Sequence, residues 1–221
     1  FTNTQGGITP FTNALFTATS AATVTGLVVV DTATYWSFSG QVIIMFLIFT
    51  GGLGIMTSAT FLLITIGQRI TLANRLLMTE TLGVNRPVAI ATLTRRIVLV
   101  VVAIQIGGFM ILSFSLMDEY PLATTLWQAG FHAVSGFNNA GFVIFPDSQS
   151  LKAFQGDYGF LIPMIILIVL GTLSFSVMLD IGSYRRFNRF TLDSKLVVTA
   201  TGLMLLLGTV VIIVAEYGNS S

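Results

Sequence analysis

The sequence predicts an all-α integral membrane protein, and two observations carry that prediction. Hydrophobic residues make up 54% of the chain and charged residues only 9%, with a mean hydropathy of +0.88. Soluble domains carry about 25% charged residues, so this composition is typical of a chain that lies in lipid. Long apolar segments without charge also alternate with shorter polar connections, which is the pattern of helices that cross a bilayer.

Four apolar stretches are long enough to cross a hydrocarbon core of about 30 Å, which takes about 20 helical residues. They are residues 41–66, 97–117, 158–179 and 196–215. Two further stretches, 11–22 and 122–134, are helix-like but too short to span, and each runs into a tail rich in Thr, Asn or Gly. We therefore expect four spans and two short helices.

The basic residues predict the orientation of these spans. Nine of the ten Lys and Arg residues fall within 69–96 and 185–195, so the positive-inside rule places both connections in the cytoplasm. The other connections carry acidic residues and a single Lys152, and belong outside. Each short helix then starts outside and is followed by a span that also starts outside. It must enter the membrane and return, as a re-entrant loop beside protein or water.

The two short helices belong to an internal repeat. At an offset of 115 residues, FTNALFTATSAATVTGLVV aligns with LWQAGFHAVSGFNNAGFVI, which pairs Ser20 with Ser135 and Gly26 with Gly141. Asp31 matches Asp147 after one inserted residue. Since both loops return to the same side and two spans separate them, the repeats are parallel, around an axis along the membrane normal. The repeat unit is a span, a re-entrant loop and a second span.

This unit divides the chain into five predicted parts, and the chain resembles a fragment whose upstream part is missing. The parts are the loop and second span of one repeat (1–68), a cytoplasmic loop with an amphipathic helix (69–96), a complete repeat (97–182), a second cytoplasmic loop (183–195), and the first span of a next repeat with an external tail (196–221).

The loops have the chemistry of a cation pore. A short helix followed by extended backbone presents carbonyl oxygens, and rings of such oxygens replace the hydration shell of an alkali cation. Glycine at the turning point allows backbone angles that are closed to other residues. Asp31 and Asp147 at the outer ends would raise the cation concentration at the mouth. The duplication carries this inference, because a single glycine after a Thr-rich stretch usually marks only a turn.

Three segments resemble a known family. TVTGL at 23–27, FNNAGF at 137–142 and RLLMTETL at 75–82 are similar to the Trk/Ktr/HKT superfamily of potassium transporters, and most similar to the membrane subunit of bacterial Ktr systems. The resemblance implies a K+-channel-like fold of four span-loop-span repeats, with one filter glycine in each. Gly26 and Gly141 would be two of these four glycines, and K+ would bind at the filter that the four form together. The implied ion contacts are the backbone carbonyls of Val24, Thr25, Leu27, Asn139, Ala140 and Phe142.

The same resemblance implies K+ uptake across a bacterial plasma membrane by a multi-pass protein. It further implies a homodimer of the complete subunit and a cytoplasmic nucleotide-binding regulatory subunit. Channel-like transport and coupling to Na+ or H+ both stay open, with Na+ as a candidate coupling ion. Two alternatives stay open: a solute transporter whose re-entrant loops bind a non-cation substrate, and a non-conducting membrane scaffold. The pattern of a catalytic site is missing from the sequence, so we expect neither an enzyme nor an organic cofactor nor a nucleic-acid partner.

Other conspicuous residues have two interpretations each. His132, in the second short helix, is either a functional ionisable group or, as we favour, a neutral hydrogen-bonded packing residue. Gly51, Gly52 and Gly54 form either a hinge or, as we favour, close contacts between helices. Residues 71–84 predict an amphipathic helix that either docks a regulatory subunit or lies at the membrane interface.

Overall fold

The computed structural model describes residues 9–54, 90–145, 151–183 and 187–217. Within these ranges the chain is helical and contains no β-strand, as the composition predicted. Two of the described helical stretches, Thr94–Leu116 and Leu192–Glu216, are long and apolar enough to cross a membrane. The chain divides into two compact units, Phe1–Thr172 and Leu173–Ser221.

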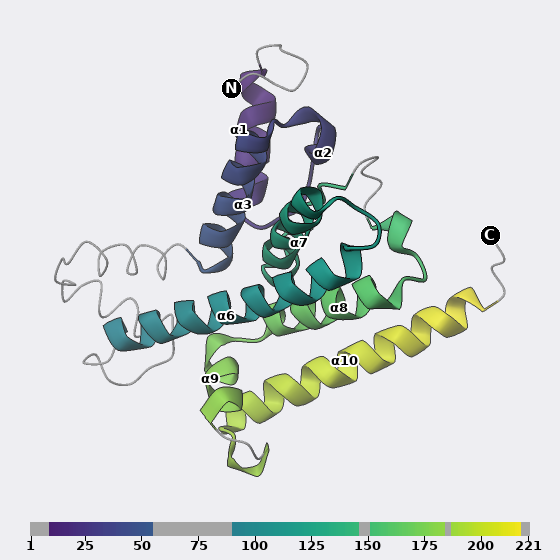
Figure 1. The fold of residues 1–221 in the computed structure, drawn as a ribbon. Coiled ribbons are helices and arrows are strands. Elements are labelled where there is room, and N and C mark those ends of the chain that lie inside the picture. Colours follow the sequence, from purple (N-terminus) through teal and green to yellow (C-terminus); the bar gives the residue numbers. More distant parts are fainter. Residues whose placement is uncertain (1–8, 55–89, 146–150, 184–186, 218–221) are drawn as a thin grey trace. The chain divides into compact units, whose positions relative to one another are not determined.

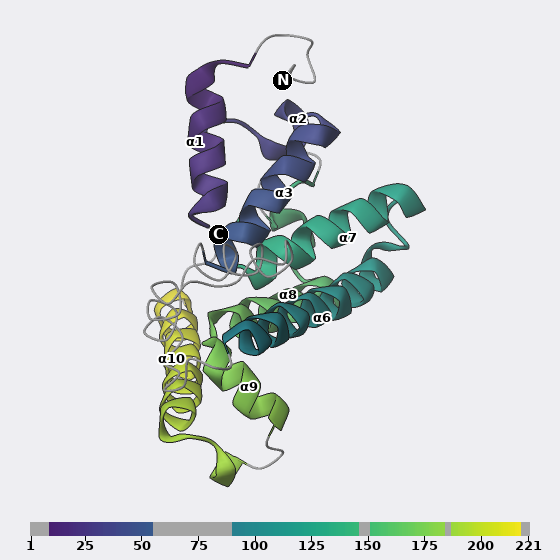
Figure 2. The ribbon, with the colours of Figure 1, turned by 90° about the vertical axis from the view of Figure 1, so that its left-hand side faces the viewer.

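The first part of the larger unit contains α1 (Phe11–Ala22), α2 (Thr32–Tyr35) and α3 (Phe38–Gly52). Pro10 precedes α1, and its fixed φ suits the start of a helix. Asp31 begins α2 by accepting hydrogen bonds from the backbone N–H groups of Ala33 (2.7 Å) and Thr34 (3.1 Å). α1 and α3 pack side by side (Figures 1 and 2).

The second part of this unit contains α6 (Ile90–Leu116), α7 (Leu122–Phe137), the short η2 (Lys152–Phe154) and α8 (Tyr158–Thr172). α6 and α8 lie side by side, and α7 packs against both of them (Figure 2). Thr125 closes the turn between α6 and α7, because its hydroxyl donates to the carbonyls of Leu116 (3.3 Å) and Tyr120 (3.0 Å).

The helix boundaries repeat along the chain. α1 and α7 end 115 residues apart, at Ala22 and Phe137. α3 and α8 each have 15 residues, and both their first and their last residues lie 120 residues apart. The five additional residues fall in the connection between loop and span, and α7, with 16 residues, is also longer than α1, with 12.

The smaller unit contains α9 (Phe175–Ser183), η3 (Phe187–Arg189) and α10 (Leu192–Glu216). Oδ2 of Asp180 accepts hydrogen bonds from Ser194 Oγ (2.7 Å), Thr191 Oγ1 (2.7 Å) and the Thr191 backbone N–H (3.0 Å). These bonds, led by the one from Ser194, lower the pKa of the Asp180 carboxyl. They join α9 to the start of α10.

The observed helices differ in their bounds from the predicted spans, and α6, for example, begins at Ile90 rather than at residue 97. The predicted span 158–179 is interrupted, because α8 ends at Thr172 and α9 begins at Phe175. Gly171 and Thr172 are poor helix formers, and the Thr172 hydroxyl bonds back to the Val169 carbonyl at 2.7 Å. α10 begins four residues before the predicted residue 196, because Thr191 accepts a hydrogen bond from the Ser194 N–H and caps the helix. In the predicted span 41–66, α3 begins at Phe38 and ends at Gly52, so the helix stops within the predicted span, and residues 55–66 lie outside the described residues.

Candidate functional site

The first candidate loop, residues 23–30, leaves α1 through a specific set of backbone hydrogen bonds. The Val24 N–H donates to the Ala21 carbonyl (3.2 Å), and the Thr25 N–H donates to the Ser20 carbonyl (2.9 Å). This pair of bonds is the Schellman arrangement, which requires a left-handed residue just after the helix. Val24 has that conformation, with a φ of 55°, and Gly26 follows with a φ of 80°.

The second candidate loop, residues 138–145, leaves α7 in the same way. The Asn139 N–H donates to the Gly136 carbonyl (3.1 Å), and the Ala140 N–H donates to the Ser135 carbonyl (2.9 Å). Asn139 has a φ of 58° and Gly141 a φ of 70°. The two loops therefore share their hydrogen bonds and their left-handed residues at an offset of 115 positions.

The two loops meet at their equivalent glycines. A Cβ atom added to Gly26 would lie 2.5 Å from the carbonyl oxygen of Ala140 and 3.4 Å from the Cα of Gly141. A Cβ atom on Gly141 would in turn lie 3.6 Å from the Cα of Gly26. Glycine is therefore required at position 26 both by its backbone conformation and by the close approach of the second loop.

An apolar interface continues outward from this contact. Phe131 of α7 and Ala140, Phe142 and Ile144 of the second loop are buried in one cluster with residues of the first three helices. Those residues are Ala21, Trp36, Ile44 and Ile48. A hydrogen bond from Trp127 Nε1 to Gln41 Oε1 (2.8 Å) joins α7 to α3 at the edge of the cluster.

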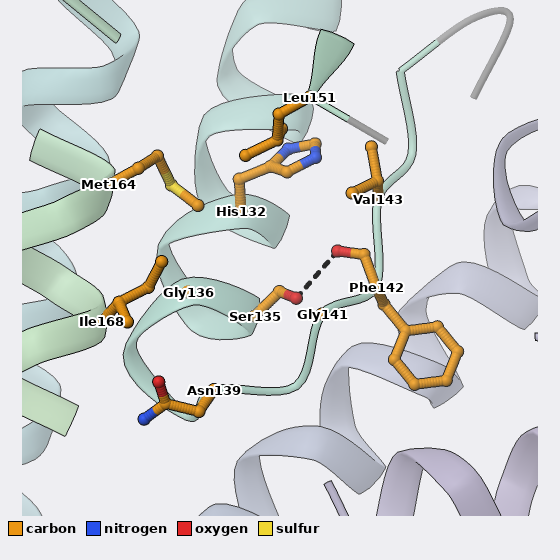
Figure 3. A pocket seen from close by; sticks show the side chains of 10 residues that line it. All are labelled: His132, Ser135, Gly136, Asn139, Gly141, Phe142, Val143, Leu151, Met164 and Ile168. Atoms are coloured by element: carbon orange, nitrogen blue, oxygen red, sulfur yellow. Dashed lines mark hydrogen bonds between the residues drawn. The ribbon is translucent and has the colours of Figure 1, made fainter. Parts of the chain in front are cut away.

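Two side chains of α7 bind the part of the second loop that follows Gly141, residues 142–145. Ser135 Oγ donates to the Phe142 carbonyl at 2.8 Å (Figure 3). The Ile144 N–H donates to Nε2 of His132 at 3.4 Å. The ring of His132 is therefore buried and hydrogen-bonded, as the interpretation favoured from the sequence requires.

A cavity of about 210 Å³ lies beside the second loop (Figure 3). Its lining comes from α7, the loop and α8, and includes Gly136, Asn139, Gly141, Met164 and Ile168. Gly141 lies on the wall of this cavity.

The glycines of α3 also have a clear role. A Cβ atom on Gly51 would overlap the Ala22 carbonyl oxygen, and one on Gly52 would overlap the Asn138 side chain. Gly171 of α8 lies in the same way against the Phe137 carbonyl. Close helix contacts are therefore confirmed for Gly51 and Gly52, whereas Gly54 has a φ of 78°, and no atom of the described residues lies within 4 Å of its would-be Cβ.

Comparison with known proteins places this arrangement in a family. A family model for TrkH, described as a cation transport protein, matches residues 2–216. The chain belongs to the TrkH family. The resemblance predicted from the loop sequences is thereby confirmed.

Curated TrkH-like relatives come from bacteria. The chain is 38% identical to the "Ktr system potassium uptake protein B" of Bacillus subtilis and of Vibrio alginolyticus, over 94% of this chain and 46% of each relative. It is 37% identical to the "Potassium/sodium uptake protein NtpJ" of Enterococcus hirae, over 98% of this chain and 48% of that protein. The chain spans about half the length of these relatives.

Of the two carboxylates predicted at the pore mouth of this TrkH-family chain, only that of Asp31 lies within the described residues. Asp31 lies directly after the first loop, and its carboxylate caps α2. Asp147 and the predicted amphipathic helix 71–84 lie outside the described residues.

Sequence reasoning missed three residues that hold the TrkH-family site together. Ser135 was aligned with Ser20 in the repeat, but the Ser20 hydroxyl has no hydrogen-bond partner among the described residues, so the alignment did not indicate the bond of Ser135 to the loop. Gln41 was placed at the start of a span and Gly171 inside one. Their contacts join segments far apart in the sequence, which a single sequence does not indicate.

Proposed function

We propose that this chain is part of a K+ uptake protein, and that residues 23–30 and 138–145 are re-entrant loops lining its pore. The observation that carries the proposal is the meeting of Gly26 and Gly141, two equivalent glycines in left-handed conformation at the ends of two matching short helices. Parallel repeats around an axis along the membrane normal would bring equivalent residues together at that axis.

Backbone geometry supports carbonyl binding of a cation. In extended backbone, successive carbonyls point to opposite sides, whereas left-handed residues at alternating positions let neighbouring carbonyls share a side. The carbonyls that would contact K+ are those of Val24, Thr25, Gly26, Leu27, Asn139, Ala140, Gly141 and Phe142. The carboxyl ends of α1 and α7 both precede the loops, so their partial negative charge would favour a cation there.

Free faces on both loops support a ring of more than two repeats. Positions of the first loop equivalent to Ala140, Phe142 and Ile144 are all exposed, namely Thr25, Leu27 and Val29. In the interface between the two loops, the side chains of Ala140, Phe142 and Ile144 pack on a surface of the first repeat. That surface includes Ala21, Val24, Ile44 and Ile48. Its counterparts in the second repeat are Gly136, Asn139, Met164 and Ile168, and they line the open cavity. Further repeats in the complete protein would fill both faces, since a head-to-tail interface closes into a ring.

The relatives extend the proposal to the complete protein. They are named for potassium or potassium/sodium uptake in bacteria. We accordingly assign this protein K+ as its transported ion and the plasma membrane as its location, and Na+ is a candidate coupling ion. A homodimer and a cytoplasmic nucleotide-binding regulatory subunit are the proposed partners.

Substitution of Gly141 by serine in the complete protein tests the filter. Gly141→Ser should lower the preference for K+ over Na+ in a flux assay, because its φ of 70° disfavours a side chain and the loop carbonyls would move. Gly156→Ser is the matched control, since Gly156 has a φ of 89° and lies outside both loops. An unchanged preference in Gly141→Ser would exclude this loop from the filter.

A further inference from the structure

We propose that His132 is a positioning residue: it holds residues 142–145 of the second loop in place, and thereby sets the preference of the filter for K+ over Na+. The inference rests on the proposed function, because it assigns a role to a residue behind the proposed filter. Its basis is the set of contacts that the His132 ring makes with its own helix, with the loop and with three aromatic rings.

The hydrogen bonds of His132 define its tautomer. Nδ1 lies 2.7 Å from the Gln128 carbonyl one turn earlier in α7, so Nδ1 must carry a proton and donate it. Nε2 lies 3.4 Å from the backbone nitrogen of Ile144, and a backbone N–H group acts only as a hydrogen-bond donor. Nε2 is therefore the acceptor, and the ring is neutral with its proton on Nδ1.

Aromatic neighbours fix the plane of the ring. His132 is 1% exposed and stacks on Phe145, with ring centroids 4.1 Å apart and planes 16° apart. Phe131 and Phe160 meet it edge-on at 5.9 and 6.3 Å. Because these rings prevent rotation about the side chain, Nε2 is held at one point facing the loop backbone.

That point lies close to the proposed filter. Ile144 follows Gly141 by three residues, and Phe142 between them is bonded through its carbonyl to Ser135. His132 and Ser135 lie one turn apart on α7, so two successive turns of one helix hold two nearby points of the loop. Selectivity among alkali cations depends on where the filter carbonyls are held and how far they can move. Loss of one of these two bonds should loosen that arrangement.

The first loop lacks both bonds. Thr17 takes the place of His132, and among the described residues its hydroxyl is buried without a hydrogen-bond partner, as is that of Ser20. Val29, the counterpart of Ile144, is exposed. The His132 bond is therefore a particular feature of the second loop rather than a general requirement of the repeat.

Three substitutions in the complete protein separate positioning from simple packing. Gln places an acceptor near the position of Nε2, Asn reaches only the position of Nδ1, and Phe keeps the aromatic contacts without either bond. The positioning role predicts that His132→Asn and His132→Phe lower the K+ over Na+ preference by about two- to tenfold, the range expected for one hydrogen bond. His132→Gln should retain most of it. A packing role predicts the opposite order, with Phe nearest to the wild type, and that order would overturn the proposal.

Two further measurements make the result decisive. Gel filtration and thermal unfolding in detergent identify variants that fail to fold. If they all fail, ¹⁵N NMR of histidine-labelled wild-type protein still tests the inference: a neutral Nδ1–H ring supports it, whereas an Nε2–H ring or an imidazolium at His132 overturns it. If Gly141→Ser changes the ion preference and all three folded His132 variants keep it, only the role of His132 is wrong. If Gly141→Ser has no effect, the filter assignment itself fails.

Discussion

Glycine at positions 26 and 141 satisfies two different requirements, although the two residues are equivalent in the repeat. Both have left-handed backbone, which costs a residue with a side chain about 1–2 kcal/mol. Only Gly26 also faces a backbone atom of the other loop, the Ala140 carbonyl oxygen, within 2.5 Å of its would-be Cβ. A backbone atom cannot turn aside as a flexible side chain can, so Gly26 tolerates less change than Gly141.

Alanine substitutions should reveal this difference. Gly26→Ala should lower the thermal unfolding midpoint of the complete protein in detergent more than Gly141→Ala, because the first variant must separate the two loops in addition to straining the backbone. K+ uptake should fall in the same order. Equal losses in the two variants would show that the contact between the loops is absent in the complete protein.

The short helices illustrate how far the sequence predicts single elements. α1 was predicted at its observed boundaries, and the Thr- and Gly-rich tail was the feature that marked its end. α7 extends three residues beyond the predicted residue 134, through Ser135, Gly136 and Phe137. Buried contacts with neighbouring helices keep these residues helical and override the low helix propensity of Ser and Gly. The interruption after α8 was missed because hydropathy does not distinguish an interrupted apolar helix from a continuous one.

Gly171 in α8 has the same role as Gly51 in α3. Each glycine lies near the end of its helix and allows that helix to contact the last carbonyl of the preceding short helix, α7 or α1. Gly171→Ala should separate α8 from the end of α7 and destabilise the protein by about 1–3 kcal/mol, the usual cost of overpacking. Unfolding in detergent measures this change. Gly107→Ala in α6 is the control, because no atom lies within 4 Å of its would-be Cβ. A similar effect of both substitutions would contradict a specific contact at Gly171.

At the scale of the molecule, the sequence predicted which residues recur but not how the recurring parts join. The alignment of Gly26 with Gly141 identified equivalent positions, and the family comparison confirmed the resemblance. The interface between the loops remained hidden, because Phe142 and Ile144 are buried whereas their apolar counterparts Leu27 and Val29 are exposed. A contact between two repeats depends on shape, and a pattern within one chain carries little information about it.

The charge at the predicted mouth also belongs to this scale. Asp31→Asn should lower K+ uptake chiefly at low ionic strength, since attraction to a surface charge is screened over about 8 Å at 0.15 M salt. Asn is as good a helix cap as Asp, so this substitution removes the charge while keeping the start of α2. Asp31→Ala removes both, and measures the cap. An equally large loss of uptake at high salt in Asp31→Asn would rule out the electrostatic role.

The bond between Trp127 and Gln41 has a practical consequence. The chain contains two tryptophans, and both Trp36 and Trp127 lie in or against the apolar cluster where the two repeats join. Indole emission responds to the polarity and hydrogen bonding of its surroundings. This chain thus carries two native fluorophores at the apolar cluster between its two repeats. Changes at that cluster during ion titration or unfolding can therefore be measured by tryptophan fluorescence without any chemical label.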